Sequence, residues 1–255
     1  MKRLIQLRLI LNYANHFQTD VKTPLPVIFE FVHNLDKDRV KQLFRTFAKT
    51  PVAKKVFASD KTVIDLIKTG SFAPGTFGAC YKEWMANDKL EDVFSAYYPT
   101  NSKSKLSKFL HTAVMEHDII HFINGYDTST FGEIGVLAFN LAREWRASYA
   151  SILYASALMA FRNTFNPHKY PKVGFWKNFI HNPFIVFCRT VIEAWRRGKR
   201  APWFMTVDWE AYLNVDLQIV KKELNLVEPP RYWSKIAPMW AKVHKQYLEY
   251  SLRKK

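Results

Sequence analysis

The stretch that decides the fold is Lys105–Ile123, which reads KLSKFLHTAVMEHDIIHFI. We predict that this stretch forms a helix. His117 and His121 then lie on one face of that helix, one turn apart. Two imidazoles at this spacing can reach the same metal ion. The sequence therefore predicts a helical element that carries a metal-binding face.

Two carboxylates stand near the histidine pair in the sequence. Asp118 directly follows His117, and Glu133 follows His121 after eleven intervening residues. Gly125–Ser129 contains the turn and capping residues that a returning chain needs. Two imidazole nitrogens and up to two carboxylates suit zinc, iron, cobalt or manganese. We therefore predict that these four side chains bind one metal; the alternative is two unrelated histidines followed by an N-capped second helix.

The segments outward from this helix also show helical patterns. Apolar residues recur at helical spacing in several further segments, namely Asp36–Lys49, Lys61–Lys68, Ser129–Arg162, Pro183–Arg197, Val215–Leu226 and Tyr232–Leu252. Only 8 glycines and few alternating Val/Thr runs argue against a sheet. Neither a linker nor an internal repeat divides the 255 residues. We predict an all-α fold with a single domain over residues 1–255.

Two segments allow either close packing or a ligand. Gly70–Gly78 reads GSFAPGTFG, a glycine-punctuated turn that could bind a phosphate at the start of the next helix. It lacks the Lys-Ser/Thr ending of a P-loop, which favours packing. The Ala- and Ser-rich middle of Ser129–Arg162 fits tight helix packing or a channel for a flat apolar ligand, and packing is again preferred.

The formal net charge of +16 favours a polyanionic partner. Residues 162–205 hold nine Lys and Arg against one acid, Glu193, and large aromatic residues are interleaved with them. This mixture fits an anionic membrane surface, where Trp and Tyr lie at the headgroup level. It also fits a nucleic-acid surface or an ordinary solvated face. Because no nucleic-acid motif accompanies the charge, we expect the membrane and not nucleic acid.

No segment has the length and polarity of a membrane-spanning helix. The longest uncharged run, Ala147–Phe161, has fifteen residues, and a span needs about 20. The N-terminal stretch Met1–Leu11 lacks the features of a signal peptide. Cys80 and Cys188 lie in apolar surroundings far apart in the sequence, so we predict two buried free thiols.

The chain resembles the Coq-four family of ubiquinone (coenzyme Q) biosynthesis proteins. The metal motif and the Gly-Glu-Ile at Gly132–Ile134 carry the resemblance. Supporting marks are Gly75, Gly78 and Tyr81 upstream, Gly198, Arg200, Ala201 and Pro202 downstream, and the segment Lys221–Leu226. The order and spacing fit over residues 26–230. Residues 231–255 form a basic C-terminal extension, and the basic aromatic stretch at 166–178 resembles an insertion.

The resemblance implies a fold, an activity and partners. The family is all-α and peripheral on the membrane that holds ubiquinone. It removes the carboxyl group from a polyprenyl-hydroxybenzoate precursor, with oxidation at the vacated ring carbon. The implied metal is divalent, usually zinc, with iron or cobalt as alternatives, and its ligands are His117, Asp118, His121 and Glu133. The implied partners are a polyprenylated aromatic lipid, other quinone-biosynthesis enzymes and further copies of the chain.

The absence of a mitochondrial transit peptide favours a bacterial member on the cytoplasmic face of the inner membrane. A eukaryotic member would lie on the matrix side of the mitochondrial inner membrane. Arg143 is the candidate partner for the aromatic headgroup, since it lies ten residues after Glu133, about 15 Å along a helix. The main alternative function is a lipid-binding scaffold with a structural metal. A metallohydrolase is less favoured, because Asp118 reaches a metal-bound water poorly.

Overall fold

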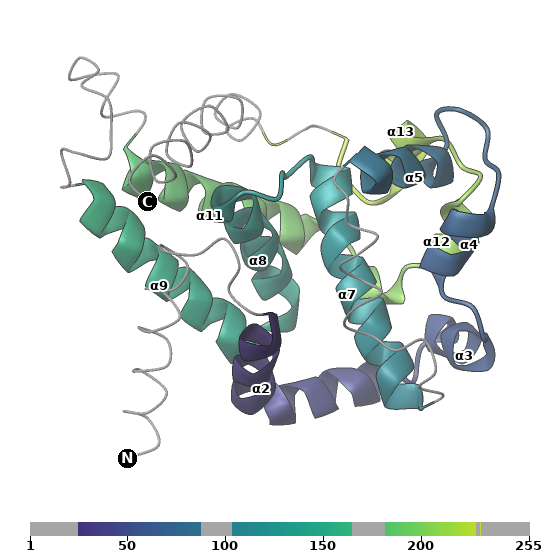
Figure 1. The fold of residues 1–255 in the computed structure, drawn as a ribbon, viewed down its shortest axis with the longest axis horizontal. Helices are drawn as coiled ribbons and strands as arrows, with labels where there is room; N and C mark the ends of the chain where they lie inside the picture. Colours follow the sequence, from purple (N-terminus) through teal and green to yellow (C-terminus); the bar gives the residue numbers. More distant parts are fainter. Residues whose placement is uncertain (1–24, 88–103, 165–181, 228–229, 231–255) are drawn as a thin grey trace, which may run out of the picture. The chain divides into compact units, whose positions relative to one another are not determined.

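The computed structural model describes residues 25–87, 104–164, 182–227 and 230. Within these ranges the helices follow one another along the chain and no strand occurs (Figure 1). They are α2 (Leu25–Phe47), α3 (Pro51–Ala58), α4 (Val63–Thr69), α5 (Phe77–Asn87), α7 (Lys105–Asn124), α8 (Thr130–Glu144), α9 (Ala147–Thr164), α11 (Pro183–Arg200), the 3-10 helix η1 (Phe204–Thr206), α12 (Trp209–Tyr212) and α13 (Leu217–Glu223). The all-α prediction is confirmed. The predicted helix Tyr232–Leu252, the extension 231–255, the stretch 166–178 and Met1–Leu11 lie outside the described residues.

The chain divides into two compact units. Unit 1 comprises residues 1–40, 127–198 and 230–255, and unit 2 comprises residues 41–126 and 199–229. The single domain over residues 1–255 stays a prediction. Within the described part of the chain, no helix is long and apolar enough to cross a bilayer.

Helix α7 runs through the core of unit 2. Helices α3, α5 and η1 pack against it, and Ile119 and Ile120 are fully buried. On the α5 side, the rings of Phe77 and Tyr81 both contact Phe122 edge-on. Burying each large apolar side chain contributes about 1.5–3 kcal/mol. The predicted helix Lys105–Ile123 is therefore present. Its apolar faces pack in the core, and the two histidines share another face.

Helices α8 and α9 of unit 1 correct the prediction of one long helix over Ser129–Arg162. They pack against each other and are separated by Trp145 and Arg146. Trp145 has a left-handed backbone (φ 48, ψ 54), and its N–H still donates to the Leu141 carbonyl, so it caps α8. A left-handed residue cannot continue a right-handed helix, and the chain turns there.

The first turn of α9, which follows this break, is capped by Asp36 of α2. Its carboxylate is 1% exposed, accepts from the backbone N–H of Ser148 at 3.1 Å and also accepts from the Ser148 hydroxyl. Arg146 donates from Nε to the same carboxylate at 3.0 Å. The carboxylate therefore serves as an N-terminal cap that comes from a distant part of the sequence.

Helix α11 extends past Gly198, where the sequence suggested that it would close. A Cβ atom at Gly198 would lie 2.3 Å from the Phe139 carbonyl oxygen of α8. The glycine therefore permits close packing of α11 on α8 and does not terminate the helix. The two cysteines are free, as predicted, but each is only half-buried.

Candidate metal centre

His117 and His121 lie one turn apart on α7 with their rings facing each other. Their Nε2 atoms are 3.2 Å apart and their ring centroids 4.9 Å apart. The helix is fixed at both ends: the Ser104 side chain accepts from Ser107 N, and Gly125 ends the helix with φ 67. His121 is 2% exposed and His117 is half-buried.

The Tyr126 carbonyl sets the tautomer of His121. It lies 3.2 Å from His121 Nδ1, and because a carbonyl oxygen only accepts, Nδ1 carries the proton. The neutral ring then presents the Nε2 lone pair toward His117. A backbone carbonyl on the second ring nitrogen is the usual arrangement around a metal-binding histidine. This contact is not evident from the sequence, since it depends on the turn after Gly125 and on a backbone carbonyl, not on a side chain.

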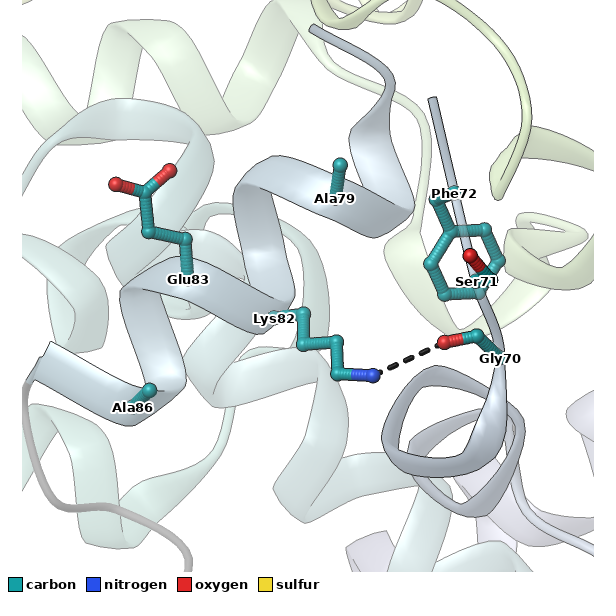
Figure 2. A pocket seen from close by; sticks show the side chains of 7 residues that line it. All are labelled: Gly70, Ser71, Phe72, Ala79, Lys82, Glu83 and Ala86. Carbon is teal, nitrogen blue, oxygen red and sulfur yellow. Dashed lines mark hydrogen bonds between the residues drawn. The ribbon is translucent and has the colours of Figure 1, made fainter. Parts of the chain in front are cut away.

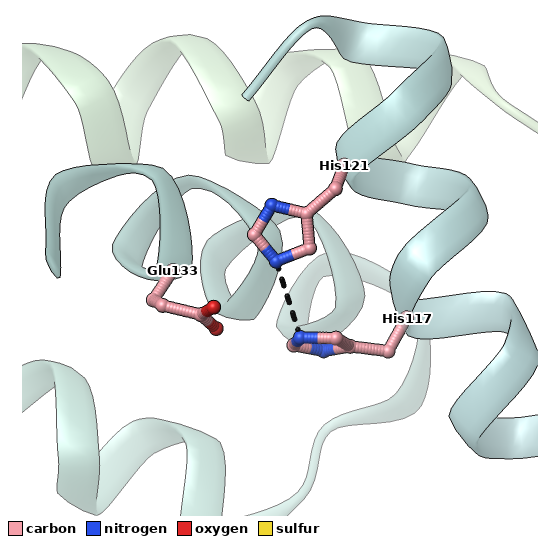
Figure 3. A group of neighbouring side chains, drawn as sticks. All are labelled: His117, His121 and Glu133. Carbon is pink, nitrogen blue, oxygen red and sulfur yellow. Dashed lines mark hydrogen bonds between the residues drawn. The ribbon is translucent and has the colours of Figure 1, made fainter. Parts of the chain in front are cut away.

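A second tight turn places Glu133 in the first turn of α8. Ser129 is the N-cap of α8 and accepts from Gly132 N, while the Asp127 carboxylate accepts from Ser129 N at 3.0 Å. The candidate ligand atoms of His117, His121 and Glu133 all lie within 4.8 Å of one another (Figure 3). The structure therefore brings together three of the four predicted ligands.

The geometry of the histidine pair fits a divalent metal. Two nitrogens bound to one tetrahedral ion at 2.0–2.1 Å lie roughly 3.3 Å apart, close to the 3.2 Å between these Nε2 atoms. Two imidazoles and one carboxylate form a donor set that suits zinc, and also iron or cobalt. The residues present therefore fit the metal that the sequence motif predicts.

Asp118 is not part of this group of metal-ligating residues within the described chain. Successive residues of a helix point about 100° apart, so the Asp118 side chain leaves α7 in a different direction from those of His117 and His121. It is buried, and it lies close enough to Tyr81 to act on that side chain electrostatically. Burial raises the pKa of Tyr81 well above its usual range, and the nearby Asp118 raises it further. A ligand role for Asp118 stays a prediction.

Gly132 lets the turn before Glu133 close, which gives a first prediction. A Cβ atom there would lie 1.8 Å from the Asp127 carbonyl oxygen. Gly132→Ala should displace the start of α8 and with it Glu133, and lower zinc affinity about 10- to 100-fold, as loss of a ligand-positioning contact does. Competitive titration with a zinc chelator measures this, with circular dichroism to confirm that the variant stays helical. Unchanged affinity would contradict the role of the turn.

Comparison with known proteins shows a likeness of fold. No protein-family model matches the chain, and no curated protein matches it. The fold is similar to the crystal structure of a "putative ubiquinone biosynthesis protein" from Nostoc punctiforme PCC 73102, with a TM-score of 0.56 and 19% sequence identity. The match covers 88% of this chain and 97% of the Nostoc chain. At this identity the likeness shows a shared all-α fold.

Arg143, the predicted headgroup partner, makes a structural contact. It projects from the last turn of α8, and its Nε donates to the Gly198 carbonyl of α11 at 2.8 Å. This bond satisfies a carbonyl near the C-terminal end of α11, where a cation is favourable. The headgroup role of Arg143 stays a prediction.

The glycine-punctuated turn before α5 borders an open hollow of about 480 Å³ (Figure 2). Its lining residues are Gly70, Ser71, Phe72, Ala79, Lys82, Glu83 and Ala86. The amides at the start of α5 are already occupied: Phe77 N donates to Val215 O at 2.8 Å and Gly78 N to Leu213 O at 3.0 Å. Lys82 donates to the Gly70 carbonyl at 2.9 Å. These bonds favour the packing interpretation of this turn over a phosphate site.

Proposed function

We propose that this protein acts in ubiquinone biosynthesis as a metal-dependent carbon–carbon lyase. In this proposal it removes the carboxyl group from a polyprenyl-hydroxybenzoate-type precursor, coupled to oxidation of the vacated ring carbon. The observation that carries the proposal is the grouping of His117, His121 and Glu133 within 4.8 Å. The motif resemblance and the shared fold with a protein named for ubiquinone biosynthesis support the choice of pathway.

The number of protein ligands distinguishes an enzyme from a scaffold. Structural zinc sites are closed by four protein ligands, whereas catalytic sites use three and keep one position open. Among the described residues the group holds three side chains, with Asp118 as the predicted fourth. A metal position that is open to the substrate would support the enzyme, and a site closed by four protein ligands would support the scaffold.

The protein's own contribution in this proposal is to hold and orient the metal. His121 presents a fixed lone pair because Tyr126 binds its other nitrogen, and Glu133 adds a negative charge from the first turn of α8. A bound divalent metal would supply Lewis-acid polarisation of a substrate oxygen. Exchanging carboxyl for hydroxyl on the ring releases carbon dioxide and is a two-electron oxidation. With dioxygen as the expected oxidant, the exchange would balance with one water consumed and one hydrogen peroxide released.

The proposed setting is a membrane surface, because the precursor is a lipid. We place the protein peripherally on the cytoplasmic face of a bacterial inner membrane, or on the matrix side of the mitochondrial inner membrane in a eukaryote. Its proposed partners are the polyprenylated aromatic lipid, anionic lipids, other quinone-biosynthesis enzymes and further copies of itself. The net charge of +16 supports the anionic surface.

A complementation experiment tests the proposed function. In a cell that lacks its own member of this family, Glu133→Ala should lower quinone content at least about 100-fold relative to wild type, since losing a metal ligand costs no less than losing an outer contact. Arg143→Ala leaves the three grouped residues intact and tests the headgroup prediction separately: normal quinone in this variant would refute the role of Arg143 and leave the metal site standing. Quantification of extracted quinone by mass spectrometry measures both. Normal quinone with Glu133→Ala would refute the enzymatic proposal.

A further inference from the structure

Helix α11 presents a basic exposed face that the metal centre does not explain. The helix carries Arg189, Arg196, Arg197, Lys199 and Arg200 against a single acid, Glu193. Arg189, Ile192 and Arg196 are all exposed and recur at intervals of three and four residues, so they share one face. Ile192 is 50% exposed between the two arginines. An exposed face with cations and an apolar side chain suits a membrane interface, because the cations attract anionic lipids and the apolar group can enter the headgroup region.

Trp145 adds an exposed aromatic ring beside this helix. It is 62% exposed, and its ring contacts that of Trp195 on α11 edge-on, with centroids 5.4 Å apart. Its left-handed backbone conformation is unfavourable for a bulky residue, and a helix C-cap of this kind is usually glycine or asparagine. The cap uses only the backbone N–H of Trp145, so the fold does not require a large exposed ring at this position, which points to a role for the ring at the surface.

We propose that Trp145, Arg189, Ile192, Trp195 and Arg196 form a docking face for an anionic lipid bilayer. All five belong to unit 1. Arginines would pair with lipid phosphates and extend their stems along the apolar boundary, while the tryptophans occupy the headgroup level. This inference rests on the proposed function, whose substrate is a membrane lipid, and names the surface that brings the protein to that lipid.

A second apolar stripe, on α9, is not part of the docking face. Tyr154, Leu158 and Phe161 are 59%, 43% and 50% exposed and recur at helical spacing. No cation lies between them; Arg162 stands only at the end of the stripe. The choice of an anionic bilayer as partner therefore follows from α11, where exposed charge and exposed apolar surface alternate.

The variant Trp145→Gly tests membrane binding without lowering the stability of the fold. Glycine is favoured in the left-handed conformation, so the variant should keep the wild-type unfolding midpoint. Removing the ring should weaken binding to vesicles of phosphatidylcholine with phosphatidylglycerol about tenfold, since interfacial binding scales with apolar area buried. Vesicle flotation of the full chain measures the affinity. Undiminished binding by Trp145→Gly would overturn the assignment of Trp145.

The double variant Arg189→Gln/Arg196→Gln tests the basic part of the face. It should bind these vesicles roughly thirtyfold more weakly, because each surface cation is worth about 1 kcal/mol at an anionic membrane. The matched control, Lys54→Gln/Lys68→Gln, removes the same charge from exposed positions in unit 2 and should bind nearly as wild type. Equal loss in both double variants would overturn the docking face, since net charge alone would then explain binding.

Metal content distinguishes this inference from the proposed function. The docking variants leave His117, His121 and Glu133 intact and should retain the wild-type amount of metal. If they bind vesicles as wild type while Glu133→Ala still abolishes quinone, the docking face is wrong and the enzymatic proposal stands. If they lose vesicle binding while Glu133→Ala makes normal quinone, the docking face stands and the enzymatic proposal is wrong.

Discussion

Purified His121→Ala should contain less than about 0.1 divalent metal ion per chain, against about one for the wild type, because tight binding needs three converging ligands. The variant removes the most deeply buried of the three grouped residues, the one whose ring is fixed by the Tyr126 carbonyl. His117 and Glu133 alone form an incomplete site. Elemental analysis by mass spectrometry, after dialysis against a weak chelator, gives the stoichiometry directly.

His111→Ala is the matched control for this experiment. His111 lies on the same helix, is half-buried and is not in the group with Glu133. Burial lowers the pKa of His111, which shows that it too occupies a desolvated position. The control should therefore retain the full metal content. Equal metal in wild type and His121→Ala would contradict the metal centre, as would equal loss in both variants.

Asp36→Ala should lower the free energy of unfolding by about 3–5 kcal/mol, the usual cost of breaking a buried ion pair by removing one partner. The carboxylate accepts from Ser148 N and from its hydroxyl, and pairs with Arg146, whose side chain is only 12% exposed. Without the Asp36 carboxylate, the first turn of α9 loses its cap. Among the described residues of unit 1, Arg146 then keeps only one carboxylate partner, Glu144, at 3.5 Å. The thermal midpoint should fall by about 10 °C.

Asp38→Ala provides the comparison for Asp36→Ala. Asp38 is on the same helix, two residues away, and is exposed. Its removal should change the free energy of unfolding by no more than about 1 kcal/mol, the upper end for an exposed ionic contact. Urea titration followed by circular dichroism measures both variants. Similar midpoints for Asp36→Ala and wild type would show that the cap does not stabilise the break between α8 and α9.

The local part of the fold was predictable from the sequence because local rules decide it. Apolar spacing marked α7, and Ser104 and Gly125 stand where a helix begins and ends. The turn and capping residues in Gly125–Ser129 likewise predicted the turn before Glu133. The short helix α3 was not predicted, although Thr50 caps it and Pro51 opens it. Thr-Pro before an apolar run is a recognisable start signal that could have revealed it.

The break between α8 and α9 could not be predicted, because distant residues create it. Nothing in the local sequence disfavours a helix through Trp145, and tryptophan rarely adopts a left-handed backbone. Asp36, more than a hundred residues earlier, binds Ser148 and Arg146 on the α9 side of this turn. The interpretation of Gly198 as a helix end failed for a similar reason: the carbonyl of Phe139, on another helix, requires the glycine.

In the candidate site, too, local spacing was predictable and contacts between distant residues were not. The spacing of His117 and His121 identified the pair, since four residues make one helical turn. Asp118 was predicted as a ligand because it directly follows His117 in the motif. The structure places it near Tyr81 and groups the other three residues without it, so its ligand role stays a prediction.

The most direct test of the metal centre is a crystal structure of the zinc-loaded protein with an anomalous difference map collected at the zinc absorption edge. We expect one strong peak at about 2.0–2.2 Å from His117 Nε2, His121 Nε2 and a Glu133 carboxylate oxygen. The distance from this peak to the Asp118 carboxylate tests the predicted fourth ligand. A peak bound by other residues, or no peak beside this histidine pair, would contradict the central claim.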